Sequence, residues 1–181
     1  LNYGPPVKTM RSYLEGMKAA PYTALSHEEE PPTVIAALGP KMLELASEMT
    51  QGAHPYFTSP EHTAMAREKL GKDSWLCVEQ KVILEKDPTK ARETAKQTAA
   101  IYKGLPNYRN NWIRMGLAEE DIDSLNDKFI DTTFAWGTEA VIRERISAHF
   151  DAGADHVCIQ PVNPNGQMTG LDWDCLEALS N

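Results

Sequence analysis

The chain has 181 residues, 41% of them hydrophobic and 24% charged, which is the composition of an ordinary soluble globular protein with one substantial core. Its formal net charge of −8 argues against nucleic acid or an anionic membrane as a partner, because either would need a basic face. No apolar stretch approaches the roughly 18 residues of a membrane span, and no signal-peptide pattern opens the chain.

Helical and strand patterns alternate along the chain. A helix is predicted at residues 8–19, and a polar, proline-bounded loop follows it. The remaining predicted elements, in chain order, are a strand at 33–38, a helix at about 40–51, a strand at 53–57, a helix at 60–70, a strand at 75–85, a helix after Asp87, an irregular insertion at 104–136 with short helices around 119–124 and 126–135, a helix opening at Gly137-Thr138, a strand at 156–160 and a helix at roughly 171–179.

This order predicts an α/β fold with a parallel sheet, because strands that alternate with helices pair through right-handed crossovers. A closed barrel of eight strands typically needs roughly 250 residues, whereas only about four strands are predicted here. The chain therefore corresponds to about half of a TIM-type (β/α) barrel, in a single domain spanning residues 1–181. A small open doubly wound sheet of four strands is the alternative, and periodicity alone does not separate the two.

The three cysteines, Cys77, Cys158 and Cys175, are odd in number and form no CxxC pair. Cys158 lies in a strand-like run, where a buried reduced thiol is expected. We therefore predict a cytoplasmic protein in a reducing environment. No HxxxH, HxH or carboxylate-pair spacing indicates a metal, so no metal site is predicted.

The sharpest change of pattern lies in residues 34–46, VIAALGPKMLELA, where a buried strand runs into Gly39-Pro40 and then into an amphipathic helix. In either architecture this corner lies on the face where active sites form. A helix N-terminus attracts phosphate or carboxylate, glycine permits close approach, and Lys41 could add a cation. The alternative is a tight turn in which glycine serves only its φ angle, and the spacing alone favours that alternative.

Four histidines are candidates for a role in the site. His54, in GAHPYF, can point at the same face as the corner and could bind a phosphate or act as an acid–base group, although a lone histidine is more often a packing residue. His156 opens a strand at its amino end, which is the stability face of a barrel. His62 and His149 lie in the first and last turns of their helices, and a cation near a helix carboxyl end favours the helix dipole.

Residues 107–112, NYRNNW, place Arg109 among amides and aromatic rings. The stretch either lines a polar pocket or forms a capped helix start on the surface, and both interpretations are open. No nucleophile constellation, P-loop or GxGxxG is present. The residues alone therefore lead no further than an α/β domain with a candidate anion site at Gly39-Pro40.

Longer stretches carry a resemblance to a known family. VIAALGPKMLELASEMTQGAHPYFTSPEHTAMAREKLG and TEAVIRERISAHFDAGADHVCIQ resemble the luciferase-like monooxygenase superfamily, and most closely its deazaflavin-dependent (coenzyme F420) oxidoreductases. GLPNYRNNWIRMG resembles a segment typical of one such branch. The resemblance extends from about residue 8 to 160. It implies a (β/α) barrel of eight strands that binds coenzyme F420 or FMN at the strand carboxyl ends.

The resemblance also implies a cofactor site, because the family's A-A-x-G-P stretch contacts the cofactor's phosphate and side chain. The corresponding residues here are Ala36, Ala37, Leu38, Gly39 and Pro40, with His54 as a secondary candidate. Coenzyme F420 is the first choice and FMN the second. The implied chemistry is hydride transfer at the deazaflavin ring carbon, whereas flavin-dependent members activate oxygen. No catalytic residue is assigned.

Only the carboxyl-terminal half of the family barrel is represented, and the chain begins with Leu1 rather than methionine. Four strands alone would leave two unpaired edges and an exposed interior face. We therefore expect a fragment, or a chain that closes its barrel as a homo-oligomer or against a missing amino-terminal half.

The expected function is a flavin- or deazaflavin-dependent oxidoreductase acting on a small-molecule substrate, or the carboxyl-terminal portion of one. The alternative is a catalytically silent half-barrel that serves as a structural or assembly module. An unrelated four-strand phosphate-binding domain is a third possibility.

Overall fold

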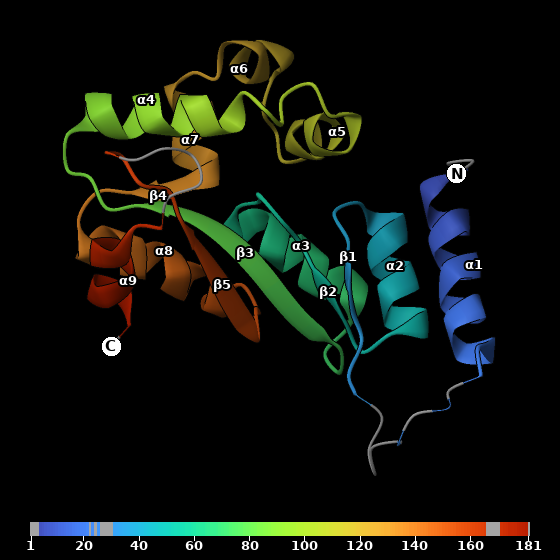
Figure 1. Cartoon of the computed structure of the whole chain (residues 1–181). Coiled ribbons are helices and arrows are strands. Elements are labelled where there is room, and N and C mark those ends of the chain that lie inside the picture. The colour runs from blue at the N-terminus through green and yellow to red at the C-terminus, as the bar shows by residue number, and fades with distance from the viewer. Residues whose placement is uncertain (1–3, 22, 24, 26–30, 166–170, 181) are drawn as a thin grey trace.

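The computed structural model describes residues 4–21, 23, 25, 31–165 and 171–180. Helices and strands alternate along the chain, apart from four consecutive helices within residues 88–133, as Figure 1 shows. The elements are α1 (Pro6–Ala19), β1 (Val34–Ala36), α2 (Pro40–Met49), β2 (Gly52–His54), α3 (Pro60–Leu70), β3 (Trp75–Ile83), α4 (Pro88–Ala99), α5 (Pro106–Arg114), α6 (Glu119–Ser124), α7 (Asp127–Thr133), β4 (Phe134–Trp136), α8 (Glu139–Asp151), β5 (His156–Pro161) and α9 (Trp173–Leu179).

The strands form one parallel sheet built around β3. β1 pairs with β2, and β2 pairs with the beginning of β3. Lys81 of β3 has a register partner on each side, Phe134 of β4 and Gln160 of β5, so β4 and β5 lie on opposite edges of β3. The predicted fold class is confirmed: β1, β2, β3 and β5, with the helices between them, are the parallel strands of a partial TIM-type barrel.

Two expectations for residues 104–136 are corrected. Residues 106–114, expected to be irregular, form α5. The helix predicted around 126–135 ends at Thr133, and residues 134–136 form the short strand β4. The pattern of residues 126–135 does not reveal this strand, because β4 is stabilised by pairing with the distant residues 81–83.

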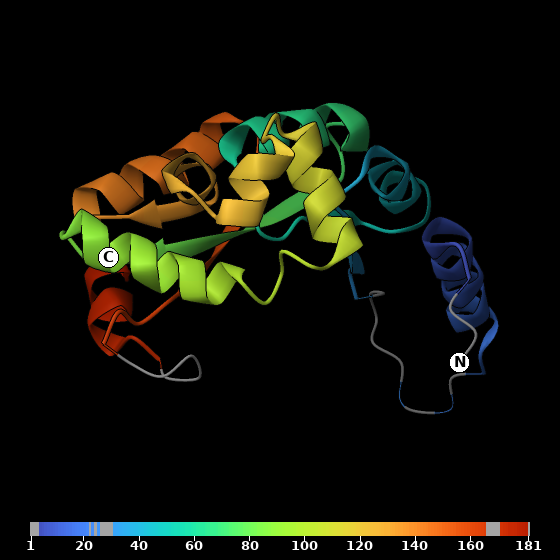
Figure 2. The same ribbon diagram turned by 90° about the horizontal axis from the view of Figure 1, so that it is seen from above.

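Helices cover one face of the sheet. In Figure 2, α2, α3 and α8 lie along the same side of the strands. Strand residues that point toward these helices are buried, among them Ile35, Ala53, Leu76 and Val78. The alternate residues point to the opposite face, because side chains on a strand alternate with a period of two. We call this opposite side the open face.

The open face is hollowed by a cavity of about 860 Å³. Its lining consists of Val34, Ala36, His54, Trp75, Cys77, Asp155, His156 and Cys158. Cys158 is therefore exposed, and the expectation that it is buried is wrong, whereas Cys175 is buried. The reason is that β5 is covered by helices on one face alone, so every second residue of this strand remains exposed.

A second hydrophobic cluster lies at the carboxyl end of the sheet, where α4, α5, α6 and α7 gather in Figure 1. Its central residues are Phe57 and Trp112, whose ring centroids are 5.2 Å apart in an edge-to-face arrangement. Within the described ranges, no helix is long and apolar enough to cross a membrane.

His149 of α8 is fully buried rather than placed as a cation at a helix end. Its Nε2 donates to Gln80 Oε1 at 2.9 Å, and its Nδ1 lies 2.8 Å from Thr63 Oγ1. Burial lowers the pKa of His149 to about 4, so its ring is neutral at pH 7 and the dipole interpretation is wrong for this residue.

We expect the free energy of unfolding to decrease by about 3 kcal/mol as the pH falls from about 6.5 to about 4, because the unfolded chain protonates His149 in this window and the folded chain does not. Burial also lowers the pKa of His62, which adds to the same trend. Urea denaturation across this pH range should give a flatter profile for His149→Gln than for wild type. The control is the exposed His156→Gln, which should keep the wild-type slope. An equal slope in all three proteins would contradict the assignment.

Candidate functional site

The corner predicted from the sequence lies between β1 and α2. Gly39 is the N-cap residue of α2, with φ −88° and ψ 157°. These angles are open to any residue, so the glycine is not required for its φ. A Cβ at this position would instead lie 3.3 Å from Arg114 Nη2. The missing side chain therefore leaves space for the guanidinium beside the backbone.

Arg114, the last residue of α5, was not considered from the sequence. Its Nη2 donates to Asn111 Oδ1 at 3.2 Å. None of the carboxylates that the structure describes is within ion-pair distance of its guanidinium. The N-terminus of α2 has no side-chain cap, and the N–H groups of Gly39 and Lys41 have no partner among the described residues. The N-terminus of α2 and the guanidinium of Arg114 thus lie side by side, and no described carboxylate balances their positive charge.

His62 holds the corner from α3. Its Nε2 donates to the carbonyl of Leu38 at 2.9 Å, and its side chain is 2% exposed. Burial lowers the pKa of His62 and favours the neutral ring. Ser59 caps the start of α3 and so sets the position of His62 in the first helical turn. The sequence placed His62 in this turn but gave no signal that it faces Leu38.

The remaining predicted site residues divide between the two faces. Ala36 and His54 are register partners and both line the cavity of the open face. Ala37 is 3% exposed and packs in the core, so its side chain is not available to a ligand there. Nδ1 of His54 donates to the carbonyl of Cys77 at 2.6 Å, which fixes the orientation of the ring.

A buried ion pair lies on the same face of β3 as Cys77, which lines the cavity. Lys81 and Glu79 of β3 have side chains that are 0% and 2% exposed, with Nζ and Oε1 3.2 Å apart. The ammonium also lies 3.7 Å from the ring centroid of Tyr56 and 4.1 Å from that of Phe57. Burial lowers the pKa of Lys81 to about 8, and it raises the pKa of Glu79. The one sequence signal for this pair is the polar run of residues 79–81 inside an apolar strand, which does not show that the two side chains meet.

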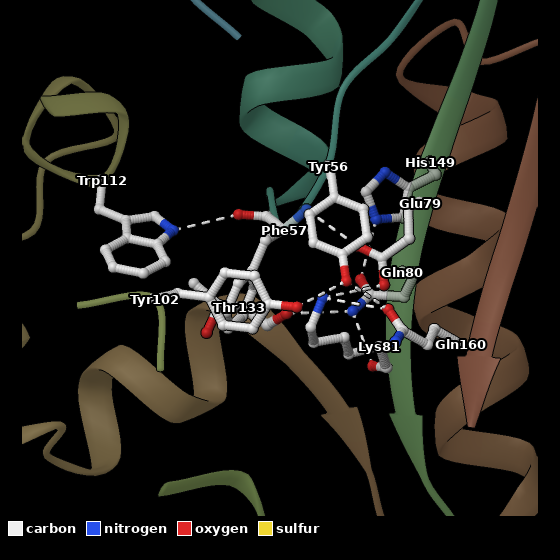
Figure 3. A network of polar contacts seen from close by, with 10 residues as sticks. All are labelled: Tyr56, Phe57, Glu79, Gln80, Lys81, Tyr102, Trp112, Thr133, His149 and Gln160. Atoms are coloured by element: carbon white, nitrogen blue, oxygen red, sulfur yellow. Dashed lines mark hydrogen bonds and ion pairs between the residues drawn. The ribbon is translucent and has the colours of Figure 1, made fainter. Parts of the chain in front are cut away.

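Hydrogen bonds extend from this pair in two directions, as Figure 3 shows. Toward β5, Lys81 Nζ and the Tyr56 hydroxyl both donate to Gln160 Oε1, at 3.3 and 2.7 Å. Toward the insertion, the Phe57 N–H donates to Glu79 Oε2 at 2.9 Å, and the Phe57 carbonyl accepts from Trp112 Nε1 at 3.1 Å. The backbone of Phe57 therefore links the ion pair on the open face to Trp112 of α5.

The amide-rich stretch 107–112 forms part of α5 and has an outer side and a buried side. Arg109 lies on the outer side of α5, where it forms ion pairs with Asp123 at 2.6 Å and Glu119 at 2.9 Å. Of the two interpretations of this stretch, a polar pocket or a helix start on the surface, the surface one holds for Arg109. Trp112 is fully buried and Asn111 is 1% exposed, so the opposite side of α5 packs inward. In the described part of the chain, no three His, Cys, Asp or Glu side chains come close enough to hold a metal ion.

Residues 7–156 match the sequence model of the luciferase-like monooxygenase family. The chain belongs to the luciferase-like monooxygenase family. The match confirms the resemblance proposed from the sequence. A search of curated proteins finds no match to the chain.

Solved structures show the same fold. Coenzyme F420-dependent tetrahydromethanopterin reductase from Methanopyrus kandleri is 18% identical with a TM-score of 0.54, over 74% of this chain and 46% of that one. An F420-dependent secondary alcohol dehydrogenase in complex with an F420-acetone adduct is 16% identical with a TM-score of 0.53, over 88% and 55%. Apo-MsnO8 is 16% identical with a TM-score of 0.61, over 99% and 61%. The chain thus spans about half to three fifths of the length of these proteins.

Proposed function

We propose that this chain is the cofactor-binding portion of an oxidoreductase that uses coenzyme F420, with FMN as the alternative. In this proposal the cofactor's phosphate lies at the corner between β1 and α2, against Gly39 and Arg114. The observation that carries it is the guanidinium of Arg114 at a helix N-terminus, where the described residues provide neither a counter-charge nor an acceptor for the N–H groups of Gly39 and Lys41. Two of the similar structures are F420-dependent enzymes, which supports the choice of a deazaflavin.

The residues present fit a phosphate. No described residue accepts from the N–H groups of Gly39 and Lys41, so they can donate to a phosphate, and the guanidinium supplies charge-assisted hydrogen bonds in a planar fork. His62 fixes the Leu38 carbonyl, so the backbone of the corner is held before a ligand arrives. The bound cofactor would supply the hydride chemistry, while the chain binds and orients it. Ala36 and His54 would then face the cofactor from the cavity of the open face.

We further propose that a complete site needs the open face to be covered. In the described part of the sheet, β1 pairs with β2 alone and β5 with β3 alone, so each has one unpaired edge. An amino-terminal set of βα units would close the barrel, and a second copy of the chain is the alternative.

The test is titration of the purified protein with coenzyme F420 and, separately, FMN, followed by fluorescence and by native mass spectrometry. We expect one cofactor per barrel-sized assembly rather than bare chains of 20.2 kDa. Binding of neither cofactor in any assembly state would contradict the proposal and favour a catalytically silent module.

Arg114→Gln should weaken cofactor affinity about tenfold or more, because a hydrogen bond between charged groups contributes about 1.5–3 kcal/mol. Gly39→Val should have a similar effect, since the new side chain displaces the guanidinium. Arg109→Gln is the matched control on the same helix, and it should stay within about twofold of wild type because its outer ion pairs are exposed. Equal affinities of the Arg114 and Arg109 variants would remove the corner from the site.

A further inference from the structure

We infer that the side-chain amide of Gln160 donates a hydrogen bond to a carbonyl oxygen of the ligand's ring system, within the site proposed above. This assignment rests on the proposed function and adds a ligand-contacting residue to it. The class of ligand is a planar heteroaromatic ring that carries carbonyl groups, which flavins and deazaflavins share.

The orientation of the Gln160 amide follows from its neighbours. An ammonium can only donate, so the amide atom 3.3 Å from Lys81 Nζ must be the oxygen. The hydroxyl of Tyr56 donates to the same oxygen at 2.7 Å. Nε2 is therefore the outer atom of the amide, and its two N–H groups have no partner among the residues that the structure describes.

The amide is also held in place before any ligand binds. Lys81 is fixed by Glu79 at 3.2 Å and by the rings of Tyr56 and Phe57, and Tyr56 is fixed by the Tyr102 hydroxyl at 3.0 Å. Figure 3 shows these groups meeting at Gln160. Donors whose position is set in advance bind an acceptor without the cost of ordering a free side chain.

The place of Gln160 in the sheet suits this role. It is exposed, at the carboxyl end of β5 and on the same face as Cys158 and His156, which line the cavity. β1 and β5 are three strand intervals apart, or roughly 14 Å at the usual spacing. A ligand whose phosphate lies beyond β1 and whose ring lies over the sheet would cross this interval.

The decisive variant is Gln160→Glu, which keeps an oxygen for Lys81 and Tyr56 and replaces both N–H donors by a second oxygen. Gln160→Leu removes the donor without adding charge. Gln97→Glu, on the exposed side of α4, is the control for the change in net charge. Thermal unfolding of each variant verifies that it folds.

Affinity for coenzyme F420 and FMN would be measured for all four proteins, together with the infrared carbonyl stretch of the bound ring. We expect both Gln160 variants to bind at least fivefold more weakly, with a carbonyl stretch at higher frequency than in the wild-type complex, and Gln97→Glu to match wild type. Wild-type affinity and frequency in the Gln160 variants would overturn the role of Gln160 and leave the proposed function standing. Failure of wild type to bind either cofactor would overturn both.

Discussion

Lys81→Met is expected to lower the free energy of unfolding by about 3–5 kcal/mol at pH 7, because it leaves Glu79 buried without its counter-charge. Methionine retains most of the length of the side chain, so the loss reports charge rather than a cavity. The loss should be smaller at pH 5 than at pH 7. Burial raises the pKa of Glu79, and removing Lys81 raises it further. In the folded variant Glu79 therefore binds a proton at a higher pH than it does in the unfolded chain. The free-energy cost of burying its charge disappears as the pH falls and the carboxylate becomes neutral.

The double variant Glu79→Gln/Lys81→Met separates the two contributions. Glutamine keeps an acceptor for the Phe57 N–H but carries no charge. We expect the double variant to be more stable than Lys81→Met alone, as found when both members of a buried ion pair are replaced. Urea denaturation at pH 5 and pH 7 measures all three proteins. If the double variant is less stable than Lys81→Met, the loss in Lys81→Met does not come from an unpaired buried charge on Glu79.

Trp112→Ala should cost about 3–5 kcal/mol, because the indole is fully buried and its loss leaves a cavity between α5 and the sheet. The indole packs edge-to-face on Phe57 and on Phe129, with ring centroids 5.2 and 4.8 Å apart. It also donates to the carbonyl of Phe57, whose left-handed φ of 62° is unfavourable for a bulky residue and must be held by its surroundings.

The control for Trp112→Ala is Ile113→Ala, one residue further along α5, where the side chain is 40% exposed. This change should cost less than about 1 kcal/mol. The urea midpoint of each variant gives the comparison. Similar losses in both variants would mean that α5 is anchored by something other than the indole.

The sequence predicted most elements, because their signals are local. The buried strand that runs into Gly39-Pro40 predicted the succession of β1 and α2. β4 was missed since its pairing partners, residues 81–83, are distant in the sequence. Cys158 was wrongly expected to be buried, because a strand pattern does not say whether both faces will be covered.

The candidate site was predicted in part. The corner at Gly39 carried a local signal, and the assignment of cofactor contacts to residues 36–40 remains a prediction. No local sequence signal pairs Arg114 or Lys81 with its partner. Arg114 meets Gly39 through tertiary packing of α5, and Lys81 meets Gln160 on the neighbouring strand. Such contacts follow from topology, and residue spacing does not contain them.

The central position of β3 has a consequence for the order of events during synthesis. β3 contributes Leu76 and Val78 to the core beside α1–α3, and Ile83 to the cluster beside α4–α7. One edge of β3, along residues 77–82, pairs with β5. β5 leaves the ribosome only after the whole insertion has been synthesised. Until then β3 emerges as an edge strand with one row of backbone groups unpaired, and such edges are templates for aggregation. A chain that stops before residue 156 therefore exposes the edge of β3, whereas the chain that includes β5 exposes the edge of that shorter strand instead.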